Sequence, residues 1–170
     1  MTESKRLPLA PADSPKSLLE VVDYRKSGLS LNHVIGCPLD CGYCVRHLLG
    51  NFSMKRPHLV MSDDAAVETL LSHWAFRAHV TPIQIFNRAT DPFLPVVQDH
   101  LLRTLELLDG RRITNHVLVI TRWKITPAIV ERLEQLKHLK VAVLVTWSGI
   151  EDRRIEPVDS AIAEASLEVL

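Results

Sequence analysis

The sequence predicts an α/β protein built from parallel βα units. Two observations point to this class: four short apolar runs have the length of buried strands, and segments with helix-start signals or apolar residues at helical spacing lie between them. Strands that alternate with helices form parallel pairs joined by right-handed crossovers. The 170 residues, of which 46% are hydrophobic, suffice for one domain with its own core. The alternation alone does not distinguish a barrel from an open sheet.

The chain divides by composition into an arm and a domain. Residues 1–28 are expected to form an N-terminal arm that is partly disordered, because its first part is rich in proline and charge. Residues 29–170 are expected to form the α/β domain. Its strands are expected at 29–35, 83–86, 117–121 and 141–146. Its helices are expected to begin at Ser62, Pro95, Thr126-Pro127 and Ala161.

Signals at the helix ends support these assignments. Ser62 is a favourable N-cap, and the two aspartates that follow place negative charge where the helix dipole favours it. The apolar face of this helix is expected to run through Trp74 to Ala78 and to lie in the core. Pro95 suits the first turn of the second helix, and Gly110 suits its C-terminal end.

The third and fourth strands are strongly apolar. The run 117–121 is expected to be buried on both faces, and the run 141–146 is expected to be a central strand. Functional residues of parallel sheets lie in the loops after the carboxyl ends of the strands. Four loops are therefore expected to meet at one rim: the cysteine-containing loop and the loops 87–95, 122–124 and 147–160.

All three cysteines of the chain, Cys37, Cys41 and Cys44, lie within the eight residues CPLDCGYC. A structural zinc site uses four ligands, whereas a cubane iron–sulfur cluster with three cysteines keeps one iron without a protein ligand, where chemistry can take place. Gly42 permits the tight backbone that such a loop requires. The alternative is a zinc site with His47 as the fourth ligand, in which ligands so close in sequence would be cramped around one tetrahedral ion.

Composition argues against several classes of protein. Twenty basic and twenty acidic side chains give a formal charge of zero, and the basic residues are scattered in doublets, so a general nucleic-acid footprint is not expected. No apolar stretch reaches membrane-spanning length, and no signal-peptide h-region is evident, so no membrane partner is expected. Three clustered cysteines do not form a disulfide framework, which indicates a reducing compartment, the cytoplasm.

Four motifs in order resemble the radical S-adenosylmethionine superfamily, and within it the spore photoproduct lyase-like group. They are SLNHVIGCPLDCGYC, NRATDPFLP, ITR and RRIEP, one after each expected strand between Leu29 and Ser160. The resemblance implies a partial (β/α) barrel of about four parallel βα units. It also implies that Cys37, Cys41 and Cys44 hold a 4Fe–4S cluster, and that S-adenosylmethionine is cleaved to a 5′-deoxyadenosyl radical that abstracts hydrogen from a substrate. The electron would come from a one-electron reductant such as flavodoxin or ferredoxin.

The resemblance also implies cofactor-binding roles for individual residues. Tyr43 would lie near the adenine, and Thr90 would meet the methionyl amino group. Arg122 would pair with the methionyl carboxylate, while Thr146 and Ser148 would offer hydroxyls to the ribose. Each residue has an ordinary alternative role, such as a packing aromatic for Tyr43, a turn former for Thr90, a surface charge for Arg122 and a strand former for Thr146.

Two departures from the group bear on activity. Spore photoproduct lyase uses a further cysteine as hydrogen donor, and this chain has no fourth cysteine, so its catalytic residue and substrate stay open. Superfamily barrels have six βα units, and about four are expected here. The alternative function is therefore a truncated cluster-binding fragment or a partner-dependent subunit without catalysis. An open edge on the strand 141–146 would favour self-association.

Overall fold

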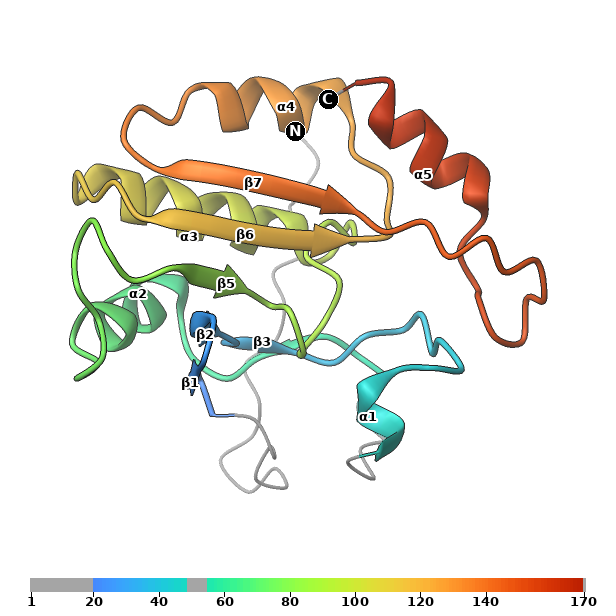
Figure 1. The fold of residues 1–170 in the computed structure, drawn as a ribbon, viewed down its shortest axis with the longest axis horizontal. Helices are drawn as coiled ribbons and strands as arrows, with labels where there is room; N and C mark the ends of the chain where they lie inside the picture. The colour runs from blue at the N-terminus through green and yellow to red at the C-terminus, as the bar shows by residue number, and fades with distance from the viewer. Residues whose placement is uncertain (1–19, 49–54, 170) are drawn as a thin grey trace.

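The computed structural model describes residues 20–48 and 55–169 and shows a five-stranded sheet with helices packed against it (Figure 1). The strand order is β1-β2-β5-β6-β7. Strands β2, β5, β6 and β7 run parallel, and β1 is antiparallel to β2. The strands are β1 (Val22–Arg25), β2 (Gly28–Leu31), β5 (Ile83–Ile85), β6 (His116–Thr121) and β7 (Lys140–Val145). The predicted α/β class with parallel strands is confirmed.

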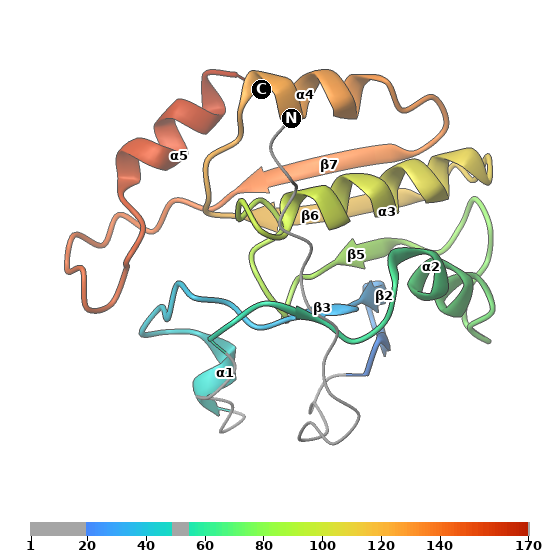
Figure 2. The same cartoon turned by 180° about the vertical axis from the view of Figure 1, so that it is seen from behind.

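The helices follow the strands in the expected order. Helices α2 and α3 cover one face of the sheet, and the reversed view places them in front of β5 and β6 (Figure 2). Among the described residues, no helix combines the length and apolar character needed to cross a membrane. The helices are α1 (Val45–Leu48), α2 (Asp63–Leu71), α3 (Gln98–Gly110), α4 (Pro127–Glu134) and α5 (Ser160–Leu167). A small second sheet pairs β3 (Val34–Ile35) with β4 (His58–Leu59).

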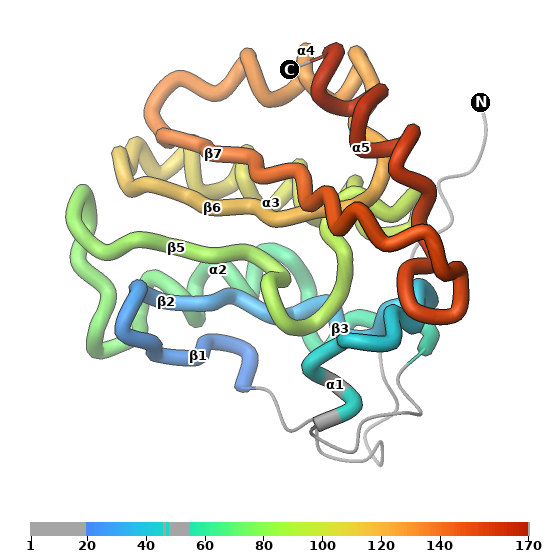
Figure 3. The backbone as a smooth tube through the Cα atoms, turned by 45° about the vertical axis from the view of Figure 1, so that its right-hand side comes forward, coloured from blue at the N-terminus to red at the C-terminus, as the bar shows by residue number. Residues whose placement is uncertain are grey.

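The core lies between the sheet and its covering helices. Alternate residues of the strands, such as Leu29, Ile83 and Val117, are fully or almost fully buried. They belong to one cluster with the apolar face of α3, including Leu101 and Leu105. The tube view follows the parallel strands side by side with this helical layer (Figure 3). Strand side chains alternate between the two faces, and burial in β6 and β7 follows this alternation, whereas all three residues of β5 are buried.

Burial corrects the expectations for the last two strands. In β6 the alternate residues Leu118 and Ile120 are only half-buried, so this strand is not buried equally on both faces. In β7 burial alternates between exposed and half-buried residues, and the strand lies at the edge of the sheet, not at its centre. The apolar run of β7 reflects packing of one face against helices. In the part of the chain that the structure describes, no further strand pairs with it.

The N-terminal part of the domain also differs in detail from the prediction. Val22–Arg25, expected within the arm, form β1 and pair with β2, while residues 1–19 lie outside the described residues. The first predicted strand is divided into β2 and β3, and the backbone N–H of Asn32 extends the β1–β2 pairing past Leu31 by bonding to the carbonyl of Val21 at 2.7 Å. The pairing of β1 with β2 begins at Val22, seven residues before residue 29, where the domain was expected to begin.

Two helices are shorter than the apolar pattern suggested. Ser62 caps α2 as predicted, but the helix ends at Leu71. The hydroxyl of Thr81 accepts a hydrogen bond from Arg77 N–H at 2.8 Å and holds the following residues in turns. Trp74 is consequently 70% exposed and stacks on Tyr24, so it is not a core residue as expected. Helix α3 begins at Gln98, after the turn that contains Pro95, and ends at Gly110 as predicted.

A buried carboxylate ties the end of β2 to both covering helices. Asp63 accepts hydrogen bonds from His33 Nε2 and from His100 Nδ1, each at 2.9 Å. Burial alone would raise the pKa of Asp63, but the hydrogen bonds from the two histidines outweigh it and lower this pKa to about 2. Burial lowers the pKa of His33, which therefore donates to the carboxylate as a neutral ring. This link fixes the segment that leads from β2 into the cysteine loop.

Candidate functional site

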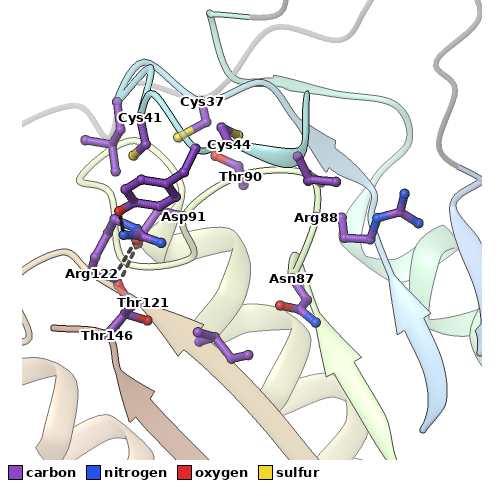
Figure 4. A pocket seen from close by; sticks show the side chains of 15 residues that line it. Cys37, Cys41, Cys44, Asn87, Arg88, Thr90, Asp91, Thr121, Arg122 and Thr146 are labelled. Atoms are coloured by element: carbon purple, nitrogen blue, oxygen red, sulfur yellow. Dashed lines mark hydrogen bonds between the residues drawn. The ribbon is translucent and has the colours of Figure 1, made fainter. Parts of the chain in front are cut away.

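A pocket of about 220 Å³ opens at the carboxyl ends of the parallel strands. It brings together the loops after β3, β5 and β6, as the rim argument predicted, together with Thr146 after β7 (Figure 4). The fourth predicted loop, 147–160, lines a neighbouring depression instead. Every predicted site residue lines the main pocket except Ser148. Ser148 lies in the neighbouring depression, which is shallower and shares Arg122 and Thr146 with the main pocket. The predicted lining residues are Cys37, Cys41, Tyr43, Cys44, Thr90, Arg122 and Thr146.

The three cysteines are held by a loop with two backbone anchors. The N–H of Gly36 bonds to the carbonyl of Ala89 at 3.1 Å. Gly36 has a φ of +102°, and a Cβ at this position would lie 2.3 Å from the carbonyl oxygen of Arg56. Cys37 and Cys41 are buried, and Cys44 is half-buried. Figure 4 shows their sulfur atoms at the same end of the pocket. The loop thus presents three soft ligands to one cavity.

The protonation of Cys41 depends on its surroundings. Burial raises the pKa of this thiol to about 11, and although the positive charge of Arg122 works in the opposite direction, the carboxylate of Glu156 adds to the increase. A thiol must lose its proton to bind a metal. Uptake of a metal by this loop would therefore release a proton from Cys41.

Thr90 presents a polar atom without a partner. Its Oγ1 is buried and forms no hydrogen bond within the described residues, although the residue lines the pocket. The backbone N–H of Thr90 bonds to the carbonyl of Phe86, which itself has a φ of +58°. Buried hydroxyls almost always have a partner, and an exception at a pocket wall indicates a place where a ligand completes the hydrogen bonding.

Asp91 organises the adjoining rim. One carboxylate oxygen accepts from the Thr121 hydroxyl at 2.6 Å and from the Phe93 N–H at 3.0 Å, and the other accepts from the Arg122 N–H at 2.8 Å. Burial raises the pKa of Asp91, and these hydrogen bonds act against that increase. The contacts show a buried carboxylate that joins the loop after β5 to the end of β6.

Arg122 lies across the pocket with its charge already paired. Its guanidinium carbon lies 4.8 Å from the centre of the Tyr43 ring. Its Nη1 donates to Tyr43 Oη and to Glu156 Oε2, the latter at 2.9 Å. The Glu156 side chain is only 5% exposed. Glu156 was not among the predicted site residues, and its place in the motif RRIEP is the signal in the sequence that points to it.

The zinc alternative finds no support in the geometry. Among the described residues, no three His, Cys, Asp or Glu side chains converge on a position that would hold a single metal ion. His47, the expected fourth zinc ligand, has its Nε2 at 3.8 Å from Asp40 Oδ1. The thiolates of a cubane cluster bind separate irons and need not converge on one point.

Comparisons with models of protein families, with curated proteins and with solved structures give no match for this chain. The functional argument therefore depends on the residues of the pocket and on their chemistry.

Proposed function

We propose that this chain binds a 4Fe–4S cluster and S-adenosylmethionine and generates a 5′-deoxyadenosyl radical, which abstracts hydrogen from a substrate of unknown identity. One observation carries the proposal: the only three cysteines share a pocket with an unpartnered threonine hydroxyl and an arginine, at the carboxyl ends of parallel strands. Parallel sheets bind their ligands at this edge. In this proposal the sheet is part of a (β/α) barrel, and the chain is a radical S-adenosylmethionine protein of the spore photoproduct lyase-like group.

The donor set of the pocket suits such a cluster. Cys37, Cys41 and Cys44 supply three thiolates and leave one iron free for a ligand. When bound, the cluster supplies the single electron that cleaves S-adenosylmethionine into methionine and the 5′-deoxyadenosyl radical. The electron would come from flavodoxin or ferredoxin in a reducing compartment such as the cytoplasm.

The remaining residues of the pocket bind and orient the cofactor. The buried Oγ1 of Thr90 is free to accept a hydrogen bond from the methionyl amino group. Arg122 supplies positive charge for the methionyl carboxylate, for which a guanidinium is well shaped. Thr146 borders both depressions and Ser148 lines the smaller one, which supports a role for their two hydroxyls in binding the ribose. Tyr43, 43% exposed, offers its ring to the adenine.

Anaerobic reconstitution with iron and sulfide tests the cluster. About four irons per chain are expected, and alanine at any one of Cys37, Cys41 or Cys44 should abolish the brown colour and its visible absorption. His47→Ala is the matched control, because the cluster does not use this side chain while the zinc alternative requires it. Full iron content in Cys41→Ala, or loss of metal in His47→Ala with one zinc in the wild type, would refute the assignment.

Binding of S-adenosylmethionine to the reconstituted protein tests the role of Arg122. Arg122→Ala should weaken binding by about 1.5–3 kcal/mol, the range of a hydrogen bond to a charged group, with unchanged iron content. Arg88→Ala is the control, because Arg88 lines the same pocket but pairs with Asp23 and points away from the cysteines in Figure 4. Equal affinities for wild type and Arg122→Ala by calorimetry would leave Arg122 as a structural charge.

A cluster-binding subunit without catalysis is the second candidate. The observation in its favour is that Arg122 is already paired with Glu156, so the pocket is electrically balanced before a ligand enters. Formation of 5′-deoxyadenosine from S-adenosylmethionine in the presence of dithionite separates the two functions. Several turnovers per chain would support the enzyme, and a reduced cluster that yields none would support the subunit.

A further inference from the structure

Glu156 carries a buried carboxylate beside the pocket that the proposed function does not use. It lies in the loop between β7 and α5 and is 5% exposed. A buried carboxylate is costly unless its oxygens are hydrogen-bonded and its charge is paired. Both conditions are met here. Oε1 accepts from the Val158 N–H at 3.2 Å, and Oε2 accepts from Tyr43 Oη and from Arg122 Nη1.

The same loop also holds the cysteine loop through its backbone. The N–H of Gly42, between the second and third cysteines, bonds to the carbonyl of Ile155 at 2.8 Å. A Cβ at residue 42 would lie 3.2 Å from Ile155 Cα, so the two segments are in close contact. Ile155 therefore binds Gly42 through the main chain, and the next residue, Glu156, binds Tyr43 through its side chain.

Arg122 is fixed at both ends but keeps hydrogen-bonding capacity. Its backbone N–H is held by Asp91, and the hydrogen bonds of its guanidinium run through Nη1. A guanidinium has five N–H donors. Within the described residues, Nε and Nη2 donate to no side chain or carbonyl, and Arg122 lines the pocket. Glu156 thus engages one corner of the guanidinium and leaves the other donors for a ligand.

We propose that Glu156 is a positioning residue that sets the orientation of Arg122 and Tyr43, so that the free guanidinium donors meet a carboxylate ligand beside the cysteine loop. This inference rests on the proposed function, in which that carboxylate belongs to S-adenosylmethionine. Simple competition between Glu156 and the ligand for the charge of Arg122 predicts the opposite effect on ligand binding. If Glu156 only competed with the ligand for Arg122, then its removal would strengthen ligand binding.

The test compares Glu156→Ala and Glu156→Gln with the control Glu151→Ala. Glu151 is an exposed carboxylate in the same loop, so its loss tests for a general effect of charge. The first measurement is amide hydrogen exchange of residues 41–45 in the metal-free proteins. Exchange should be faster in Glu156→Ala and unchanged in Glu151→Ala. This arm needs neither cluster nor cofactor.

The second measurement is the change in the electron paramagnetic resonance spectrum of the reduced, reconstituted proteins as S-adenosylmethionine is added. We expect Glu156→Ala to bind about tenfold more weakly, the scale of one charged hydrogen bond, with unchanged iron content. Glu156→Gln should recover most of this loss, because its amide oxygen still accepts from Arg122 Nη1. The double variant Glu156→Ala/Arg122→Ala should bind no more weakly than Arg122→Ala alone, because both changes act through one guanidinium.

Each outcome decides the proposal. Tighter binding in Glu156→Ala would overturn it in favour of competition, and additive losses in the double variant would overturn the shared path through Arg122. Unchanged exchange in Glu156→Ala would refute the attachment of the cysteine loop. A wild-type protein that takes up no cluster would overturn the proposed function instead, and the exchange comparison would still decide whether Glu156 holds the loop.

Discussion

Replacement of Asp91 by alanine should destabilise the protein by about 3 kcal/mol. The change leaves the donors of Thr121, Phe93 and Arg122 without the carboxylate that accepts from them at 2.6, 3.0 and 2.8 Å. Hydrogen bonds to a charged group contribute about 1.5–3 kcal/mol each, and three such bonds set the upper limit. Relief from burying a carboxylate offsets part of this loss, because burial raises the pKa of Asp91 and so disfavours its charged form.

Urea unfolding followed by far-ultraviolet circular dichroism measures this difference. Asp99→Ala is the matched control, because Asp99 is 61% exposed and pairs with Arg132 at 3.5 Å, so its loss should cost less than about 1 kcal/mol. Asp91→Asn should fall between the two, because its single carbonyl oxygen still accepts from part of the set. A loss in Asp91→Ala no larger than that in Asp99→Ala would show that the rim does not depend on this carboxylate.

The pH dependence of unfolding adds a check with a defined sign. Because the pKa of Asp91 is higher in the folded protein than in the unfolded chain, the folded state binds the proton more tightly. The contribution of Asp91 to stability therefore falls as the pH rises from the unfolded pKa through the raised folded pKa. Asp91→Asn should lack this component. Parallel stability profiles of wild type and Asp91→Asn above pH 4 would show that the pKa of Asp91 is not raised in the folded protein, and a contribution that grows with pH would show that it is lowered.

Three further outcomes are expected. Asp63→Asn should cost roughly 1.5–3 kcal/mol by urea unfolding, because the hydrogen bonds from His33 and His100 lose their charged acceptor. Because the folded pKa of Asp63 is lowered to about 2, the wild-type advantage should disappear as the pH falls below 3.8, and a constant difference down to pH 2 would contradict this. Gly28→Ala should unfold at a much lower urea concentration, because the φ of Gly28 is +118° and the new Cβ would lie 2.1 Å from the Pro82 carbonyl oxygen. Gly110→Ala, which has open space around the new Cβ, should be neutral or stabilising. Similar effects of the two substitutions would be inconsistent with the geometry. Self-association through the β7 edge should weaken in Leu144→Lys, because Leu144 is 52% exposed on that strand; sedimentation that shows the same monomer for both proteins would exclude this edge.

Helix caps, apolar runs and the cysteine triplet were predictable because their signals lie within a few residues. The cap at Ser62 and the end of α3 at Gly110 follow from the backbone groups that a helix leaves unpaired. The same local pattern overextended α2 through Trp74, because the hydroxyl of Thr81 competes for the backbone beyond Ser72. The edge position of β7 was also missed, because an apolar run is found both in central strands and in edge strands that pack one face against helices.

The sequence by itself determined which chemistry is present: three thiols in one loop, and polar residues after each strand of a parallel α/β array. Only the tertiary structure decided how those groups are paired. Tyr43 and Glu156 are 113 positions apart, and their contact depends on where the β7–α5 loop crosses the cysteine loop. Asp91 and Thr90 are neighbours, yet the carboxylate accepts several hydrogen bonds while the hydroxyl finds no partner among the residues that the structure describes. Such differences arise from packing between distant segments, whose geometry no local pattern encodes.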